Sequence, residues 1–281
     1  MQNLGAGPAD LHLHSTASDG HDRPSVVMRR AARAGIAVLA LTDHDTVAGL
    51  AEAADEALSL GLNFVPGAEL SADFAGLDAH LIALDIDPAH PRLAAHEAGL
   101  RRERERRARA MVDRLDRRGL GVSIAAIEGE AGGAPWGRPH IARALVRAGR
   151  CSSEAEAFRR FLGRRGLAYV AKQAPPAALV IDTIHAAGGL AVLAHPGSSG
   201  ITEDLLRQLA ALGLDGVEVV HPEQSPSERE SWRRLAGELG LALSGGSDDH
   251  GGGRRQHLGQ VSVPAAWLDS LRAARRAVVA L

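Results

Sequence analysis

The sequence has few of the residues that build disulfides, aromatic platforms or membrane spans. Its 281 residues include a single cysteine, Cys151, which excludes an internal disulfide and a cysteine-based metal site. Aromatic residues make up 3% of the chain, so we expect no long surface for stacking nucleic-acid bases. No run of about 18 apolar residues occurs, and Met1–Pro8 lacks the basic and apolar regions of a signal peptide. We therefore expect a soluble, cytoplasmic protein with no membrane partner.

Charge of neither sign dominates. The 32 basic and 34 acidic residues nearly cancel, which argues against a global attraction to nucleic acid or to anionic membranes. Any anion-binding site must therefore be local. Lys172 is the only lysine, so such a site would rely mainly on arginine. Arg254 and Arg255, on a glycine-rich loop, are expected to be solvated charges.

Short apolar runs alternate with amphipathic helical stretches in both outer parts of the chain. Helices are expected from about residue 24 to Gly35 and from Val47 to Leu60. Besides an extended segment at 10–15, the apolar runs predict strands at 36–41, 63–66, 80–85, 190–194, 216–220 and 241–244. Strands that alternate with helices over this length predict an α/β fold with a parallel, closed or nearly closed barrel.

The alternation breaks in the middle of the chain. A long charged helix is expected over Leu100–Arg118, a glycine-rich loop over Gly129–Gly137, and short helices over Ile141–Ala148 and Glu154–Leu162. We interpret residues 89–178 as an inserted, mostly helical cap. The barrel would then consist of residues 1–88 and 179–281.

Residue types that bind metals recur next to the predicted strands. His12 and His14 lie two apart on an extended segment, so their side chains point the same way. The other candidates are Asp19, His44, Glu69, His80, His195, Asp248 and His250. Glu69, His44, His195, Glu218 and Asp248 all fall at the carboxyl ends of strands, where barrel enzymes carry their sites. Nitrogen and carboxylate ligands without thiolates favour Zn, Mn or Fe, and about nine ligands exceed what one ion can hold.

Six short motifs resemble those of the PHP (polymerase and histidinol phosphatase) superfamily. They are Asp10-Leu-His-Leu-His-Ser-Thr16, Ser18-Asp-Gly20, Leu41-Thr-Asp-His-Asp-Thr46, Pro66-Gly-Ala-Glu69, Ala194-His-Pro-Gly197 and Gly246-Ser-Asp-Asp-His250. In the cap, Trp136-Gly-Arg-Pro-His-Ile-Ala-Arg143 and Tyr169-Val-Ala-Lys172 resemble the branch of nucleoside 3′,5′-bisphosphate phosphatases. Members of that branch also act as 5′→3′ exoribonucleases on short RNA.

The resemblance implies a distorted (β/α)7 TIM-like barrel with a trinuclear metal site. His12, His14, Glu69 and Asp248 would hold the first ion; Glu69, His80 and His195 the second; Asp19, His44 and His250 the third. Two or three ions are expected, with Mn²⁺ favoured and Zn²⁺ or Fe²⁺ as alternatives. Asp43 or His221 would protonate the leaving group. Asp249 departs from the aromatic or apolar residue common at this position, which puts the packing of its loop in question.

A bisphosphate needs a second anion site away from the metals, for which Arg138, His140, Arg143 and Lys172 in the cap are the candidates. The expected reaction is removal of the 3′-phosphate from nucleoside 3′,5′-bisphosphates by a hydroxide that the ions generate from water. The alternatives are a 5′→3′ exoribonuclease at the same site, a histidinol-phosphate phosphatase, and a non-catalytic metal-binding module that serves a partner. The expected ligand is a nucleotide or short RNA and not DNA, and the sequence leaves the oligomeric state open.

Overall fold

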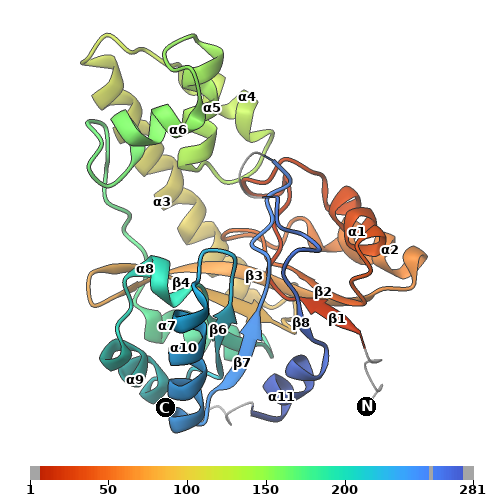
Figure 1. Cartoon of the computed structure of the whole chain (residues 1–281). Helices are drawn as coiled ribbons and strands as arrows, with labels where there is room; N and C mark the ends of the chain where they lie inside the picture. Colours follow the sequence, from red (N-terminus) through yellow and green to blue (C-terminus); the bar gives the residue numbers. More distant parts are fainter. Residues whose placement is uncertain (1–6, 253–255, 275–281) are drawn as a thin grey trace.

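The barrel wall is a single sheet. The protein is described by a computed structural model that covers residues 7–252 and 256–274, so Arg254 and Arg255 lie outside the described residues. In the described part of the chain, strands are arranged in the order β7-β6-β5-β4-β3-β2-β1-β8 (Figure 1). Their bounds are β1 Pro8–Asp10, β2 Val38–Leu41, β3 Asn63–Phe74, β4 Leu77–Leu84, β5 Leu190–Leu193, β6 Gly216–Val220, β7 Ala242–Gly245 and β8 Val263–Pro264.

The wall is nearly closed, because the segment after β1 forms backbone hydrogen bonds with the end of β7 and the segment after it. The Leu11 N–H donates to the Gly245 carbonyl at 3.2 Å, and the His14 N–H donates to the Asp249 carbonyl at 3.0 Å. Neighbouring strands are parallel from β1 to β3 and from β5 to β7. The predicted distorted (β/α)7 barrel is confirmed.

The β3–β4 hairpin is where the sheet departs from the parallel pattern. β4 is antiparallel to both β3 and β5, and β3 runs on to Phe74 instead of ending at Pro66 as predicted. The longer β3 is stabilised by eight residue pairs with β4, from Gly67–Leu84 to Phe74–Leu77. β4 begins at Leu77, three residues before His80. Because β4 runs against its neighbours, its early residues lie at the rim where the parallel strands end.

Amphipathic helices cover the barrel. The flanking helices are α1 Pro24–Arg33, α2 Leu50–Leu60, α7 Ala177–Ala186, α8 Pro196–Ser199, α9 Glu203–Ala211, α10 Pro226–Leu239 and α11 Ala266–Ala274. In α1, Pro24 occupies the first turn, where no backbone donor is lost, and Val27, Met28 and Ala31 are buried on one face. Within the described residues, no helix is both long and apolar enough to cross a membrane.

The cap stands above one end of the barrel and is attached through α3 (Figure 1). Its helices are α3 Pro91–Asp116, α4 Ile124–Ala131, α5 Arg138–Arg147 and α6 Glu154–Ala157, followed by the π-helical turn η1 Phe158–Leu162. α3 begins nine residues earlier than predicted, with Pro91 in its first turn. α4 includes Gly129, so the expected loop is shorter than Gly129–Gly137.

Cap and barrel have separate apolar cores. The barrel core runs from Ala9 to Leu93 and from Ala177 to Leu271, and the cap core runs from Ala108 to Ala168. Leu93 and Ala177 belong to the barrel core although both lie inside the predicted insert. The domain boundaries at 88/89 and 178/179 stay a prediction, with which the two cores agree to within a few residues.

The first part of α3 carries a partly buried carboxyl group, that of Glu97. Burial, with a smaller contribution from the nearby Asp45 carboxylate, raises the pKa of Glu97 from 4.5 to about 7, against a hydrogen bond from the Val47 backbone. The Glu97 Oε1 atom is buried without a hydrogen-bond partner. The folded state therefore holds the Glu97 proton more tightly than the unfolded state. Stability is lost as the pH rises from about 4.5, the ordinary pKa, through about 7, the pKa in the fold.

We expect Glu97→Gln to be more stable than the wild type at pH 8 and closer to it at pH 4.5, because glutamine does not ionise. Thermal melts at both pH values measure the difference. Asp113→Asn, at an exposed position of the same helix, should differ from the wild type by the same amount at both pH values. An equal gap between Glu97→Gln and wild type at the two pH values would contradict the assignment.

Candidate metal centre

The carboxylate of Glu69 is surrounded by five histidines from four segments. It projects from β3 and is 1% exposed. Its Oε1 atom lies 2.8 Å from His80 Nδ1 and 3.0 Å from His195 Nε2. Its Oε2 atom lies 2.9 Å from His44 Nδ1, 3.3 Å from His14 Nε2 and 3.4 Å from His12 Nε2. One buried carboxylate is therefore shared among imidazoles that are far apart in the sequence.

The ligand atoms of His12, His14 and Glu69 have the spacing of a single coordination site, and Asp248 lies beside the two histidines. His12 Nε2 and His14 Nε2 lie 3.1 Å apart. Asp248 Oδ1 lies 3.5 Å from the first and 3.1 Å from the second, and Glu69 Oε2 lies 3.4 and 3.3 Å from them. Tetrahedral ligands at typical metal–ligand distances are separated by about 3.3–3.4 Å. These four residues are the ones predicted for the first ion.

Buried polar atoms in this cluster lack hydrogen-bond partners among the described residues. Glu69 Oε2, His14 Nδ1 and His44 Nδ1 are all in this state. A buried carboxylate oxygen that accepts no hydrogen bond is costly unless a cation satisfies it. The donor set, with its nitrogen and carboxylate atoms at ligand spacing, thus fits divalent metal ions such as Zn²⁺, Mn²⁺ or Fe²⁺.

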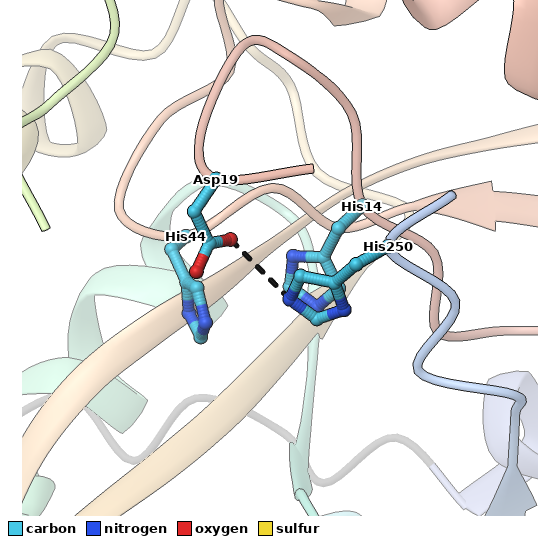
Figure 2. A group of neighbouring side chains, drawn as sticks. All are labelled: His14, Asp19, His44 and His250. Carbon is cyan, nitrogen blue, oxygen red and sulfur yellow. Dashed lines mark ion pairs between the residues drawn. The ribbon is translucent and has the colours of Figure 1, made fainter. Parts of the chain in front are cut away.

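A second group of ligand atoms lies beside the first. His14, Asp19, His44 and His250 each place one ligand atom within 4.8 Å of the others. Figure 2 shows these side chains and the ion pair between Asp19 Oδ1 and His250 Nε2 at 3.3 Å. His250 Nδ1 lies 2.8 Å from the Asp248 carbonyl. Because a carbonyl only accepts hydrogen bonds, Nδ1 carries the proton and the Nε2 lone pair faces the site.

The nine predicted ligands are therefore brought together at one rim of the barrel. His44, Glu69 and His80 form a further compact group, and His195 completes the contacts to Glu69. His195 and Asp248 have φ of 26° and 48°, a region that non-glycine residues rarely adopt. Such strain is typical of functional positions. The division of these ligands among three ions stays a prediction.

Glu218 positions two ligands, a role that the sequence did not assign. Its Oε1 atom lies 3.1 Å from His12 Nδ1, and its Oε2 atom accepts the His195 N–H at 2.8 Å. The carboxylate fixes the proton of His12 on Nδ1, so that Nε2 is free to bind a metal. Its place near the end of a strand, three residues before His221, was the available signal.

Asp10 stabilises the backbone of the segment that carries His12. Its Oδ1 atom accepts the N–H groups of Ser247 at 2.9 Å and His12 at 3.3 Å. Burial raises the pKa of Asp10 to about 7 despite these hydrogen bonds. The first motif residue therefore connects the His12 segment to the loop that carries Asp248.

The ionisation of the two carboxylates favours cation binding. Burial alone would raise the pKa of Glu69, but His44, His80 and His12 outweigh it and hold the pKa well below its ordinary value. The pKa of Asp248 is likewise held down, with burial opposed by His250 and His12. Both carboxylates are therefore ionised at neutral pH. Burial, partly offset by Glu69, lowers the pKa of His44 to about 4, which leaves a neutral imidazole.

The two proton-donor candidates have different surroundings. Asp43 accepts hydrogen bonds from the Ser15 N–H at 2.8 Å and from the hydroxyls of Ser15 and Ser18 at 2.6 Å each. With both oxygens occupied as acceptors, Asp43 holds the loop, and its position does not support the predicted role in protonation. His221 Nδ1 accepts the Glu223 N–H at 3.2 Å, so Nε2 carries the proton, 3.4 Å from Asp248 Oδ2. The geometry favours His221.

The two oxygens of Asp249 are fully paired. It is buried, and it forms a two-pronged ion pair with Arg30 at 2.7 and 3.3 Å. Its oxygens also accept the N–H groups of Gly251, His257 and Leu258. An arginine and three backbone donors surround this buried carboxylate, which explains how the ligand loop packs.

A cavity of about 660 Å³ connects the metal rim with the cap. Arg138, Arg143 and Lys172 line it together with His44, His80 and His250. His140 does not: it is 1% exposed, its Nδ1 accepts the Gly137 N–H at 2.9 Å, and its ring bonds the Ser18 backbone. The predicted contact between His140 and substrate is not supported, because its ring nitrogens hold the cap to the rim loop.

Two arginines of α3 also line this cavity although the sequence did not single them out. Arg104 pairs with Asp45, the neighbour of His44, at 2.6 Å. Arg107 donates to the Val170 carbonyl at 2.8 Å. In the sequence both lie within a run of alternating charges, where nothing separates them from the solvated arginines around them.

An α/β barrel with histidines and carboxylates gathered at one rim around a shared carboxylate defines the class of metal-dependent hydrolases. The model of the PHP domain matches residues 10–183. The chain belongs to the PHP domain family.

Relatives cover most of this chain. A 5′-3′ exoribonuclease of Haemophilus influenzae is 38% identical over 86% of this chain and 89% of its own length. A 3′,5′-nucleoside bisphosphate phosphatase of Chromobacterium violaceum is 38% identical over 87% of each. A phosphoribosyl 1,2-cyclic phosphate 1,2-diphosphodiesterase of Eggerthella lenta is 36% identical over 91% and 99%. A crystal structure from Bifidobacterium adolescentis, described as a candidate metal-dependent phosphoesterase, has a TM-score of 0.88 and 30% identity over 96% and 97%.

Substitution of His14 or Asp248 by alanine should abolish turnover and lower the metal content while the protein stays folded, because each removes a ligand atom and the barrel core is elsewhere. Metal analysis, circular dichroism and phosphate release measure the three effects. His96→Ala, on α3 outside the cluster, is the control. Full activity in either ligand variant would contradict the assignment.

Glu218→Gln should weaken metal binding by about 10- to 100-fold, because an amide no longer fixes the proton of His12 on Nδ1. Metal titration of the stripped protein measures the affinity. Glu230→Gln, at an exposed position of α10, should bind metal like the wild type. Unchanged affinity in Glu218→Gln would mean that His12 is oriented by packing alone.

Proposed function

We propose that this protein is a metal-dependent phosphoesterase that removes the 3′-phosphate from nucleoside 3′,5′-bisphosphates. The observation that carries the proposal is the shape and charge of the 660 Å³ cavity, which has the metal-ligand cluster on one side and the cationic cap wall on the other. Such a cavity can hold a ligand with a phosphate at each end. The bisphosphatase among the relatives supports the same substrate.

The cap is well suited to anions. Residues 89–178 contain 19 of the 32 basic residues but only 9 of the 34 acidic ones. Lys172, the single lysine, extends from the cap to the rim, where its Nζ lies 3.4 Å from His80 Nε2 and 2.8 Å from Asp78 Oδ1. At this position it can contact a phosphoryl group held at the metal rim.

The residues of the metal centre would have separate roles in the reaction. When bound, divalent ions supply charge neutralisation of the phosphoryl oxygens and activation of water. His12, His14, Glu69 and Asp248 would hold one ion, with His80 and His195 serving a second and Asp19, His44 and His250 a third. Mn²⁺ is our proposed ion. Glu218 keeps His12 in its ligand tautomer, and His221 presents the Nε2 proton to the reacting group from the side of β6.

A second candidate function is 5′→3′ exoribonuclease activity at the same centre, as in the Haemophilus relative. Here the attacked phosphate carries a further nucleotide, which needs a path away from the cap. A small cavity of about 80 Å³, lined by Ser198, His221 and Glu223 among others, opens on that side of the centre. Its size favours a free 3′-phosphate over a continuing strand, and therefore the bisphosphatase.

The remaining alternatives have less support. A histidinol phosphate carries one phosphate and leaves the cationic cap wall without a ligand. A non-catalytic module would be expected to have lost ligands, whereas all nine positions are filled. We retain a nucleotide or short RNA as the partner and a cytoplasmic location as parts of the proposal.

The purified protein with Mn²⁺ should release phosphate from adenosine 3′,5′-bisphosphate much faster than it shortens a 5′-phosphorylated RNA oligomer, because the site has room for a single nucleotide. Phosphate release and gel analysis of the oligomer compare the two, with Asp248→Ala as the blank. Efficient stepwise shortening of the oligomer would make the second function the principal one. Inactivity on both would refute the substrate assignment.

A further inference from the structure

Two arginines in the cavity wall have no carboxylate partner among the described residues. Arg104 is paired with Asp45, Arg143 lies 3.8 Å from Glu130, and Lys172 is paired with Asp78. Arg107 and Arg138 also line the cavity, but no acidic side chain lies within ion-pair distance of either. The cap therefore contains two kinds of cation, neutralised and unneutralised.

Arg107 projects from α3 and is only 9% exposed. Its Nε donates to the Val170 carbonyl at 2.8 Å, and its guanidinium carbon lies 5.6 Å from the Tyr169 ring centre. The Nη2 atom is buried without any hydrogen-bond partner. A buried guanidinium with an unused donor is costly, and an oxyanion ligand would remove this cost.

Arg138 is the first residue of α5, and its guanidinium carbon lies 5.8 Å from the Phe158 ring centre. The two charges repel each other: burial and then Arg138 lower the pKa of Arg107 to about 10. Arg107 still carries its charge at neutral pH. The fold thus places two like charges near each other at the cavity wall, and Asp78 attracts both from beyond ion-pair distance. A bound anion in contact with both would stabilise this arrangement further.

The position of this pair relative to the metal rim follows from one short segment. Val170, which accepts the hydrogen bond from Arg107, precedes Lys172 by two residues, so their Cα atoms are at most about 7 Å apart. Lys172 reaches His80 at the rim. The cavity therefore has one cation beside the metal ligands and an arginine pair farther into the cap.

We propose that Arg107 and Arg138 form the subsite for the 5′-phosphate of the nucleotide, gripping it from two helices with their unpaired guanidinium groups. This inference rests on the proposed function, because that function supplies a ligand with a second phosphate. It assigns Arg143 a different role: its Nη1 lies 3.4 Å from the Asp19 carbonyl, so it holds a ligand loop. Lys172 acts at the rim and not at the 5′-phosphate.

Binding to the metal-free protein tests the subsite independently of turnover. Calorimetric titration with adenosine 5′-monophosphate should show binding to the wild type and at least tenfold weaker binding to Arg107→Gln and to Arg138→Gln. The double variant should lose less binding free energy than the sum of the losses in the two single variants, because both arginines bind one phosphate. Arg107→Lys keeps the charge but loses the planar guanidinium, so its affinity should lie between those of the wild type and Arg107→Gln.

Kinetics separate a binding role from a structural one. In the metal-loaded enzyme, Arg107→Gln should raise the KM for adenosine 3′,5′-bisphosphate at least tenfold and leave kcat/KM for adenosine 3′-monophosphate unchanged. Arg109→Gln, on the same helix with its guanidinium over Trp136, is the matched control and should change neither.

Tight nucleotide binding by both single variants, or equal losses on the two substrates, would overturn the subsite. Failure of the wild type to bind adenosine 5′-monophosphate would overturn it as well. If the wild type binds this nucleotide but does not hydrolyse the bisphosphate, the proposed function fails and the arginine pair stands as an anion site for another reaction.

Discussion

The arrangement of this protein depends on a carboxylate that is buried inside a barrel. Glu69 has 1% of its surface exposed, and a group of this kind is stable only when positive or donating groups surround it. Histidines from the segments after β1, β2 and β5 and from β4 supply that environment. The same histidines are left with lone pairs and orphan atoms that point inward, so the cluster is completed by cations and not by the protein alone.

The cap is joined to this centre through a second buried charge. Asp45 follows the candidate ligand His44 in sequence and has φ of 55°. Its oxygens accept the Ser71 N–H and hydroxyl at 2.7 and 2.8 Å and the Arg104 guanidinium of α3 at 2.6 Å. One carboxylate thereby links β3, the loop after β2 and the cap helix. Breaking such a pair would leave an uncompensated charge, so this contact holds the cap helix to the loop at the metal rim.

The sequence predicted the fold correctly where the local hydrophobic pattern decides the structure. It did not predict the features that depend on which strands pair with each other. The runs 36–41, 190–194 and 216–220 are strands because continuous apolar sequence is stable only inside a parallel sheet. The direction of β4 and the length of β3 have no such local signal, since a hairpin forms when two segments satisfy each other's backbone groups. The ionisation of Glu97 and the pairing of Asp249 could likewise not be predicted, because both depend on residues distant in the chain.

The sequence by itself determined the family, the barrel class and the set of nine candidate metal ligands, because short motifs carry these features and each motif specifies its own local backbone. Tertiary structure decided what each polar residue does within the site. It turned Asp43 and His140 into supports whose hydrogen-bonding atoms are occupied, and it gave Glu218 a positioning role. It also distinguished Arg107 and Arg138 from the other cap arginines, since whether a charge is neutralised depends on which neighbours folding brings within a few ångströms.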